Sequence, residues 1–177
     1  MEETKVLLHT CCAPCSSAII ECLMQNGITP TIYYCNPNIY PQQEYEIRKD
    51  ECTRYAKSLG LEIVDADYDH ENWLREVAGM ENEPERGGRC LKCFKLRLLR
   101  TAQFAAQRGI KVITTTLASS RWKSLDQINE AGRWACAKVN ENLSAVPSES
   151  GVPSENAVVW WDQNWRKGGL QERRLQI

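Results

Sequence analysis

The N-terminal part of the sequence, up to about residue 65, alternates between short apolar runs and segments in which apolar residues recur at helical spacing. Strand patterns occupy residues 5–9, 29–34 and 61–64, and helical patterns occupy residues 18–23 and 44–59. Consecutive strands separated by helices pair in parallel, and the helices then cover the faces of the sheet. This alternation predicts an α/β fold with a mainly parallel sheet between layers of helices.

The rest of the sequence continues this pattern. Helical spacing is found at residues 89–108 and 119–139, and apolar runs typical of strands at 111–117 and 158–161. The acidic and polar segment 65–88 is expected to cover the open end of the sheet.

Three further expectations concern individual helices. Ser16 and Ser17 are expected to cap the first helix, because serine side chains accept hydrogen bonds from the N–H groups at helix N-termini. Ile47 is expected on the buried face of the helix at 44–59. The helix at 89–108 is expected to bury one apolar stripe, which consists of Leu91, Phe94, Leu98, Ala102 and Ala105.

The chain of 177 residues is long enough for one domain with a real core, which we expect to span residues 1–177. Hydrophobic residues make up 42% and charged residues 25%, a balance typical of globular proteins in water. Residues 140–156 contain Val-Pro-Ser-Glu twice and are expected to form a flexible surface insertion. No secretion signal or long apolar run is visible, so we expect a cytoplasmic protein without membrane contact.

Nine cysteines are many for a chain of this size, and their spacing is informative. Cys11, Cys12 and Cys15 follow the first predicted strand directly, at the edge where parallel sheets bind ligands. Cys90 and Cys93 open another helix, and their spacing of three places them on one face. Because cytoplasmic thiols stay reduced, such clusters indicate metal binding or redox chemistry rather than disulfide cross-links.

Two pairs of thiolates supply the four ligands of a [4Fe–4S] cluster or of a closed zinc site. Spacing alone does not decide which of Cys11, Cys12 and Cys15 take part. Cys12 and Cys15 also form a C-x-x-C pair, so a thiol–disulfide oxidoreductase stays open beside a zinc-stabilised binding module without catalytic activity. The cysteines that stand singly in helix or strand patterns are expected to be small buried hydrophobes: Cys22, Cys35, Cys52 and Cys136.

Several residues in loops after predicted strands are candidates for substrate contact, because these loops share the rim of the sheet with Cys11. They are Asn36, Tyr40, Ser120, Trp122 and Lys123. The net charge of −1 provides no overall attraction for nucleic acid, so a nucleic-acid partner requires a local basic patch. Arg166 and Lys167 are candidates for phosphate contacts in such a patch.

Five ordered motifs together resemble the epoxyqueuosine reductase QueH family. They are LLHTCCAPC at 7–15, YYCNPNIYP at 33–41, RCLKCFKLRL at 89–98, TTTLASSRWK at 114–123 and WWDQNWRKGG at 160–169. The match covers nearly the whole chain outside residues 140–156. The resemblance implies a three-layer α/β sandwich of the adenine-nucleotide-hydrolase type, which is HUP or Rossmann-like.

The resemblance also implies an activity, the two-electron removal of the epoxide oxygen from epoxyqueuosine in tRNA at the end of queuosine biosynthesis. By matching motif positions, it implies that Cys11, Cys12, Cys90 and Cys93 hold a [4Fe–4S] cluster. Some members hold a separate mononuclear iron beside the cluster, and Cys15 is the candidate ligand for it. The reaction requires tRNA carrying epoxyqueuosine and an external low-potential electron donor.

The end of the sequence departs from the family pattern. Family members continue past the basic residues near this end to a Cys-Gly-Cys motif, whereas this sequence stops at Ile177. Either the C-terminal end is truncated, or this version of the protein cannot re-reduce itself in the usual way. Folding and cluster binding are expected not to depend on the missing motif.

Overall fold

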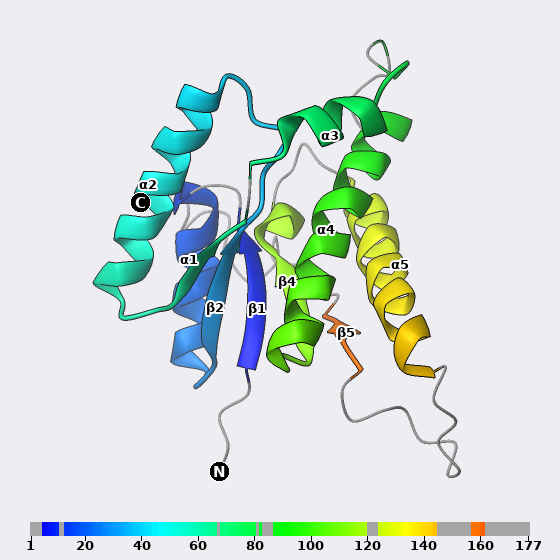
Figure 1. Ribbon diagram of the computed structural model, residues 1–177. Coiled ribbons are helices and arrows are strands. Elements are labelled where there is room, and N and C mark those ends of the chain that lie inside the picture. The colour runs from blue at the N-terminus through cyan, green and yellow to red at the C-terminus, as the bar shows by residue number, and fades with distance from the viewer. Residues whose placement is uncertain are drawn as a thin grey trace.

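The computed structural model describes residues 5–10, 13–66, 68–80, 82, 87–119, 124–144 and 157–161. The strands in these ranges are β1 (Lys5–Thr10), β2 (Thr29–Tyr34), β3 (Ile63–Asp65), β4 (Val112–Thr115) and β5 (Val159–Trp160). They form one sheet in the order β3-β2-β1-β4-β5, and each neighbouring pair is parallel. The central strand β1 lies between β2 and β4, with Leu8 opposite Ile32 and Thr114 (Figure 1).

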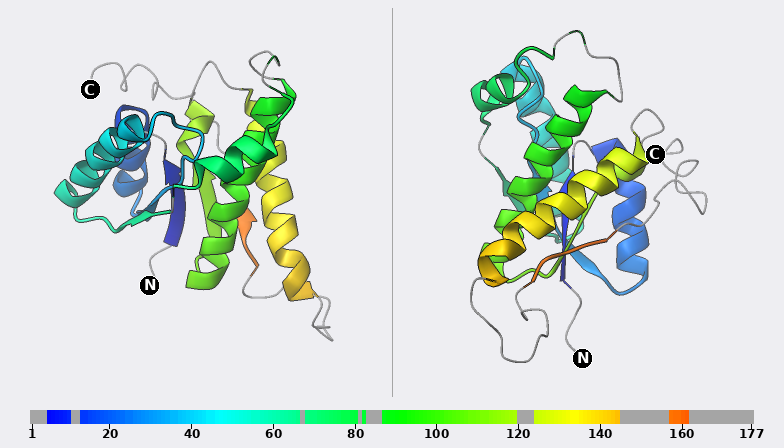
Figure 2. Two further views of the ribbon diagram at one scale, coloured as in Figure 1. Left: turned by 45° about the horizontal axis from the view of Figure 1, so that its top comes forward. Right: turned by 90° about the vertical axis from the view of Figure 1, so that its right-hand side faces the viewer.

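Helices cover both faces of this sheet. They are α1 (Ala13–Gln25), α2 (Gln42–Ser58), α3 (His70–Glu76), α4 (Gly88–Arg108) and α5 (Leu125–Ser144), with a short 3-10 helix η1 (Thr116–Ser119). α1 packs against α2 and β2, while α4 packs against α5 and β4. Figure 2 places α1 and α4 on opposite sides of the strands, which confirms the predicted three-layer α/β sandwich. None of the helices within the described ranges has both the length and the apolar composition needed to cross a bilayer.

The core forms where the strands meet the two helix layers. Val6, Leu7 and Leu8 of β1 are at most 1% exposed, because a central strand of such a sheet is covered on both faces. The stripe predicted for α4 is confirmed for four members, Phe94, Leu98, Ala102 and Ala105, and the fifth, Leu91, is partly buried. This packing anchors α4 on the sheet and thereby positions its first turn.

α1 begins earlier than predicted, at Ala13, so Ser16 and Ser17 lie inside the helix and do not cap it. Pro14 accounts for the early start. Proline lacks the N–H group that the first turn of a helix leaves unused, and its fixed φ angle suits a helix. As a result, only Cys11 and Cys12 separate β1 from α1 in the sequence.

The predicted burial of Ile47 is wrong, since its side chain is 48% exposed. Ile47 is two positions from the buried Tyr45, and two residues correspond to roughly 200° around an α-helix. The segment 65–88 contains a helix that the sequence did not predict, α3, and no residue of it is buried. Without an apolar stripe, α3 leaves no periodic signal, although it lies over the carboxyl ends of the strands (Figure 1).

α5 continues to Ser144, so the expected insertion starts after residue 144 rather than at residue 140. Asn140 ties this last part of the helix to the start of β5. Its Nδ2 donates to the carbonyl oxygen of Val158, and its Oδ1 accepts from the Val158 N–H, both at 2.9 Å. The predicted insertion from residue 145 to 156 lies outside the described residues.

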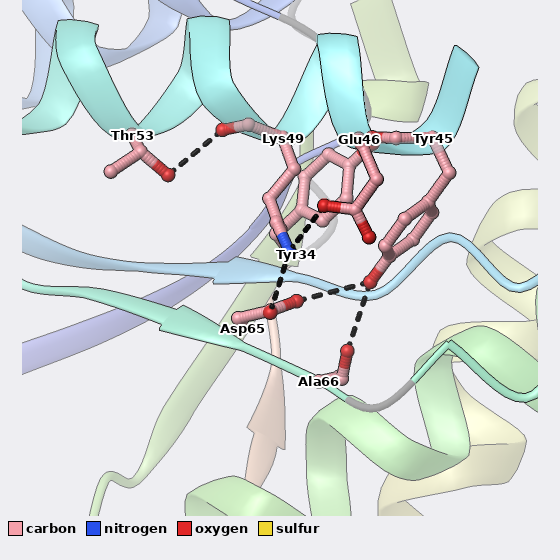
Figure 3. Close-up of polar contacts among 7 residues, drawn as sticks. All are labelled: Tyr34, Tyr45, Glu46, Lys49, Thr53, Asp65 and Ala66. Atoms are coloured by element: carbon pink, nitrogen blue, oxygen red, sulfur yellow. Dashed lines mark hydrogen bonds and ion pairs between the residues drawn. The ribbon is translucent and has the colours of Figure 1, made fainter. Parts of the chain in front are cut away.

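A tyrosine of α2 fastens that helix to the end of β3. The Tyr45 hydroxyl lies 3.0 Å from Oδ1 of Asp65 and 2.9 Å from the carbonyl oxygen of Ala66, and it donates to these acceptors (Figure 3). Lys49 bridges Glu46 and Asp65 at 2.7 and 3.2 Å. Burial, helped by the Asp65 carboxylate, raises the pKa of Tyr45, so its hydroxyl keeps the proton that it donates.

The strand order changes direction at β1. The chain adds β2 and β3 on one side of β1, and β4 and β5 on the other. In parallel sheets, a crevice opens beyond the carboxyl ends of the strands at such a reversal. The region beyond Thr10 of β1 and Thr115 of β4 is therefore the place where a ligand site is expected.

Candidate metal centre

Cys90 and Cys93 lie at the start of α4, whose N-terminus is at the same end of the molecule as the carboxyl ends of the strands (Figure 1). They are three residues apart on one helix and therefore share a face. Unpaired N–H groups give the N-terminus of a helix a partial positive charge, which suits the binding of a negatively charged group. The position suits two cysteines that bind a metal as thiolates.

A pocket of about 220 Å³ opens at these two cysteines. Cys93 is buried and Cys90 is partly buried. The indole Nε1 of Trp73, from α3, donates to the sulfur of Cys93 over 3.2 Å. The lining residues are Asn38, Trp73, Arg89, Cys90, Cys93, Phe94 and Arg97.

The guanidinium of Arg97 is buried beside Cys93, one helical turn further along α4. Arg97 is only 4% exposed, and its Nη1 lies 3.9 Å from the Cys93 sulfur. None of the ion pairs among the described residues gives Arg97 a carboxylate partner. Because a buried cation is costly without an opposite charge, the site is electrostatically suited to anionic sulfur.

Hydrogen bonds connect this helix turn to the end of β1. Arg97 Nη2 donates to Oδ1 of Asn36, and Asn36 Nδ2 donates to the carbonyl oxygen of Thr10 over 2.9 Å. Thr10 is the residue directly before Cys11 in the sequence. One buried amide side chain therefore joins the strand that leads to the first cysteine pair with the helix that carries the second.

His9, a buried residue of β1, makes hydrogen bonds near the same connection between β1 and α4. Its Nε2 lies 2.8 Å from the carbonyl oxygen of Cys35, and its Nδ1 lies 2.9 Å from Oγ1 of Thr115. A carbonyl only accepts, so a neutral His9 carries its proton on Nε2 and accepts from the threonine hydroxyl. The residue is 0% exposed, so His9 is a buried structural link between β1, the Cys35 carbonyl and Thr115.

The two predicted contact residues that the structure describes have different environments. Asn36 is 1% exposed, and both ends of its amide are engaged within the protein. Tyr40 is 75% exposed and lies on the loop between β2 and α2. The structure thus gives Asn36 an internal role, and the contact of either residue with a substrate stays a prediction.

Most of the other predicted site residues lie outside the described part of the chain. Within that part, no group of three or more metal-binding side chains is found. The backbone of Cys15 belongs to α1, but its side chain is not described. The residues that lie outside altogether are Cys11, Cys12, Ser120, Trp122, Lys123, Arg166 and Lys167.

Neither Arg97 nor Trp73 is among the site residues predicted from the sequence. A signal for Arg97 was available, because it is four residues after Cys93 and seven after Cys90, on the same helix face. Trp73 carries no comparable signal. Its place at the pocket results from the packing of α3 on α4.

Cys35, Cys52 and Cys136 are buried as predicted, whereas the predicted burial of Cys22 is wrong, since it is only partly buried. Burial raises the pKa of Cys35 to about 11 and that of Cys136 to about 12. Both stay protonated at neutral pH, and a protonated thiol is a poor nucleophile and metal ligand. They are small hydrophobic residues of the core, as expected from their isolated positions.

The chain resembles known proteins over almost its whole length. A family model described as "Epoxyqueuosine reductase QueH" matches residues 6–177. Three similar curated proteins carry the same name, and each alignment of 173 residues covers 98% of this chain. They come from Histophilus somni at 46% identity, Haemophilus influenzae at 44% and Acinetobacter baylyi at 43%.

These relatives are longer than the chain. The alignments cover 65%, 64% and 72% of the three proteins, in the same order. The chain therefore spans about two thirds of the length of the curated relatives that it matches.

Proposed function

The chain belongs to the epoxyqueuosine reductase QueH family, and from this membership we propose that it reduces epoxyqueuosine in tRNA to queuosine, the final step of queuosine biosynthesis. In this reaction both C–O bonds of the epoxide break and a C=C double bond forms. The oxygen leaves as water after taking up two electrons and two protons. An external low-potential donor supplies the electrons, and the tRNA substrate implies a cytoplasmic location.

The observation that carries the proposal is the hydrogen-bonded path from Thr10 through Asn36 to Arg97 at the Cys93 turn. It supports a convergence of the two cysteine pairs, which are far apart in the sequence. Four thiolates from Cys11, Cys12, Cys90 and Cys93 match the ligand set of a [4Fe–4S] cluster.

The surroundings of Cys93 fit such a cluster. Trp73 and Arg97 both direct N–H groups at its sulfur, and such donors would support a sulfur ligand bound to iron. When bound, the cluster and a mononuclear iron at Cys15 would supply single electrons and a Lewis acid for the epoxide oxygen. The proposed contacts with the nucleoside are Tyr40, Ser120, Trp122 and Lys123. The proposed contacts with phosphate are Arg166 and Lys167. Asn36 holds Arg97 in place.

Cys90→Ala tests the proposal, with Cys22→Ala as the matched control because Cys22 is also partly buried and belongs to neither cysteine cluster. Anaerobically prepared wild-type chain is expected to be brown, with iron and sulfide in the ratio of a [4Fe–4S] cluster. Cys90→Ala is expected to lose the visible absorbance and the reduction of epoxyqueuosine in tRNA, while the control keeps both.

Other results would contradict the proposal. Colourless protein with stoichiometric zinc would indicate a zinc-stabilised binding module. Colourless, metal-free protein with a titratable disulfide between Cys12 and Cys15 would indicate a thiol–disulfide oxidoreductase. A Cys90→Ala variant with unchanged absorbance and turnover would remove this residue from the ligand set.

A further inference from the structure

Near-parallel aromatic rings connect the surface to the cysteine pocket. The ring centroids of Tyr40 and His70 lie 5.3 Å apart with 21° between the planes, and those of His70 and Trp73 lie 5.6 Å apart with 18°. Trp73 in turn donates to the sulfur of Cys93. A side chain exposed on the loop after β2 is thus linked by stacking to the side wall of the pocket.

Two hydrogen bonds hold the loop that carries Tyr40 against α3 and the segment just before it. Nδ1 of His70 donates to the carbonyl oxygen of Pro37 over 2.7 Å, and the Tyr68 hydroxyl donates to the carbonyl oxygen of Ile39. Tyr68 also stacks on His70, with 13° between the rings. Because both sides of the contact are fixed, the Tyr40 ring is positioned before any ligand arrives, which reduces the entropy cost of binding.

The exposure of Tyr40 is unusual for this chain. Tyr33, Tyr34 and Tyr45 are at most 5% exposed, whereas Tyr40 is 75% exposed. With His70 against one part of the ring, the exposed remainder offers a flat apolar surface, which is connected to the pocket through His70 and Trp73. Unpaired bases of RNA are commonly bound by stacking on such exposed aromatic side chains.

We propose that Tyr40 is a stacking platform for an unpaired base of the RNA loop that carries the modified nucleoside, and that His70 positions it. This inference rests on the proposed function, which supplies the RNA. It assigns the binding mode to ring stacking rather than to the tyrosine hydroxyl. It also assigns α3, which the sequence did not predict, a part in holding the substrate.

Binding of a fluorescently labelled anticodon stem–loop to the full chain tests the platform. Tyr40→Ala is expected to weaken binding by roughly 5- to 150-fold, the range observed for loss of one base–aromatic stack. Tyr40→Phe keeps the ring and is expected to bind within about twofold of wild type. Ile47→Ala, which removes an exposed apolar side chain of α2 that does not line the pocket, is the control and should bind like wild type.

Two further measurements separate stacking from a general structural effect. The platform is uncharged, so the salt dependence of binding should have the same slope in wild type and Tyr40→Ala. If His70 acts only through Tyr40, His70→Ala should weaken binding on its own but add nothing to Tyr40→Ala in the double variant. Additive effects of the two changes would overturn the positioning role.

The platform would be overturned if Tyr40→Ala bound the stem–loop within about twofold of wild type. It would also be overturned if Tyr40→Phe lost as much binding affinity as Tyr40→Ala. Failure of the proposed function is recognised separately. Wild-type chain that binds the stem–loop in a Tyr40-dependent way, but cannot reduce epoxyqueuosine, supports the platform and refutes the activity. Wild-type chain that does not bind the stem–loop refutes both.

Discussion

Replacing Asn36 with alanine is the sharpest test of the junction between β1 and α4. The Asn36 amide is the described link between the Thr10 carbonyl and the Arg97 guanidinium. Asn36→Ala removes both hydrogen bonds at once. It leaves a buried guanidinium without one of its acceptors, next to Cys93.

The expected loss of stability follows from the two bonds. A neutral hydrogen bond contributes about 1 kcal/mol, and one to a charged group about 1.5–3 kcal/mol. Together they predict that Asn36→Ala lowers the free energy of unfolding by roughly 2.5–4 kcal/mol. For a chain of this length, that corresponds to a fall in Tm of roughly 5–15 °C.

Urea unfolding of the metal-free chain, followed by circular dichroism, measures this change without a contribution from the metal. Asn38→Ala is the matched control, because Asn38 is on the same loop and its Oδ1 has no hydrogen-bond partner among the described residues. The control should lose less than about 1 kcal/mol. A loss below about 1 kcal/mol in Asn36→Ala, or an equal loss in both variants, would refute the account of the junction.

Three other predictions concern packing, pH and substrate binding. Gly132→Ala should destabilise the chain by roughly 1–3 kcal/mol in urea unfolding, because the added Cβ would lie 2.1 Å from the Trp160 ring. In a helix, replacing glycine with alanine usually increases stability, so an increase here would contradict that contact. Burial raises the pKa of Cys35 from 9.0 to about 11, so the folded chain binds more protons than the unfolded chain between these values. Its contribution to stability is therefore complete below pH 9 and is lost as the pH rises to about 11, and Cys35→Ala should show a shallower alkaline decline in urea titrations. Lys167→Ala should weaken tRNA binding and reduce the salt slope by about one, and an unchanged slope would exclude a phosphate contact.

The strands and the long helices were predictable because their residues repeat a local pattern. β2 has the bounds that the run at 29–34 predicts, and α4 differs by one residue at its start. α3 escaped prediction because it buries no side chain, and its start depends on the Asp69 side chain, which accepts from the N–H of Asn72 at 3.2 Å. Ile47 was misplaced because apolar character alone does not tell on which side of a helix a residue lies.

The cysteines of the site were predictable, since closely spaced thiols are visible without a fold. Asn36 and Tyr40 were predicted as loop residues on the same rim, but without their partners. The partners of Cys93 come from different elements, Trp73 from α3 and Arg97 from α4. His70 has no motif around it, and its role depends on a ring contact with Tyr40, which lies on the loop after β2. Such contacts join residues that are distant in the sequence, and no periodicity or spacing records them.

The order of secondary structure elements and the positions of the thiols were set by the sequence alone, because both arise from residues that are neighbours or lie within a few helical turns. The tertiary structure alone decided that the end of β1 lies beside the Cys93 turn, with Asn36 as the bridge. It also decided that a buried cation is located there. These are consequences of packing α4 against the reversal point of a parallel sheet, where chain segments far apart in sequence must share one edge.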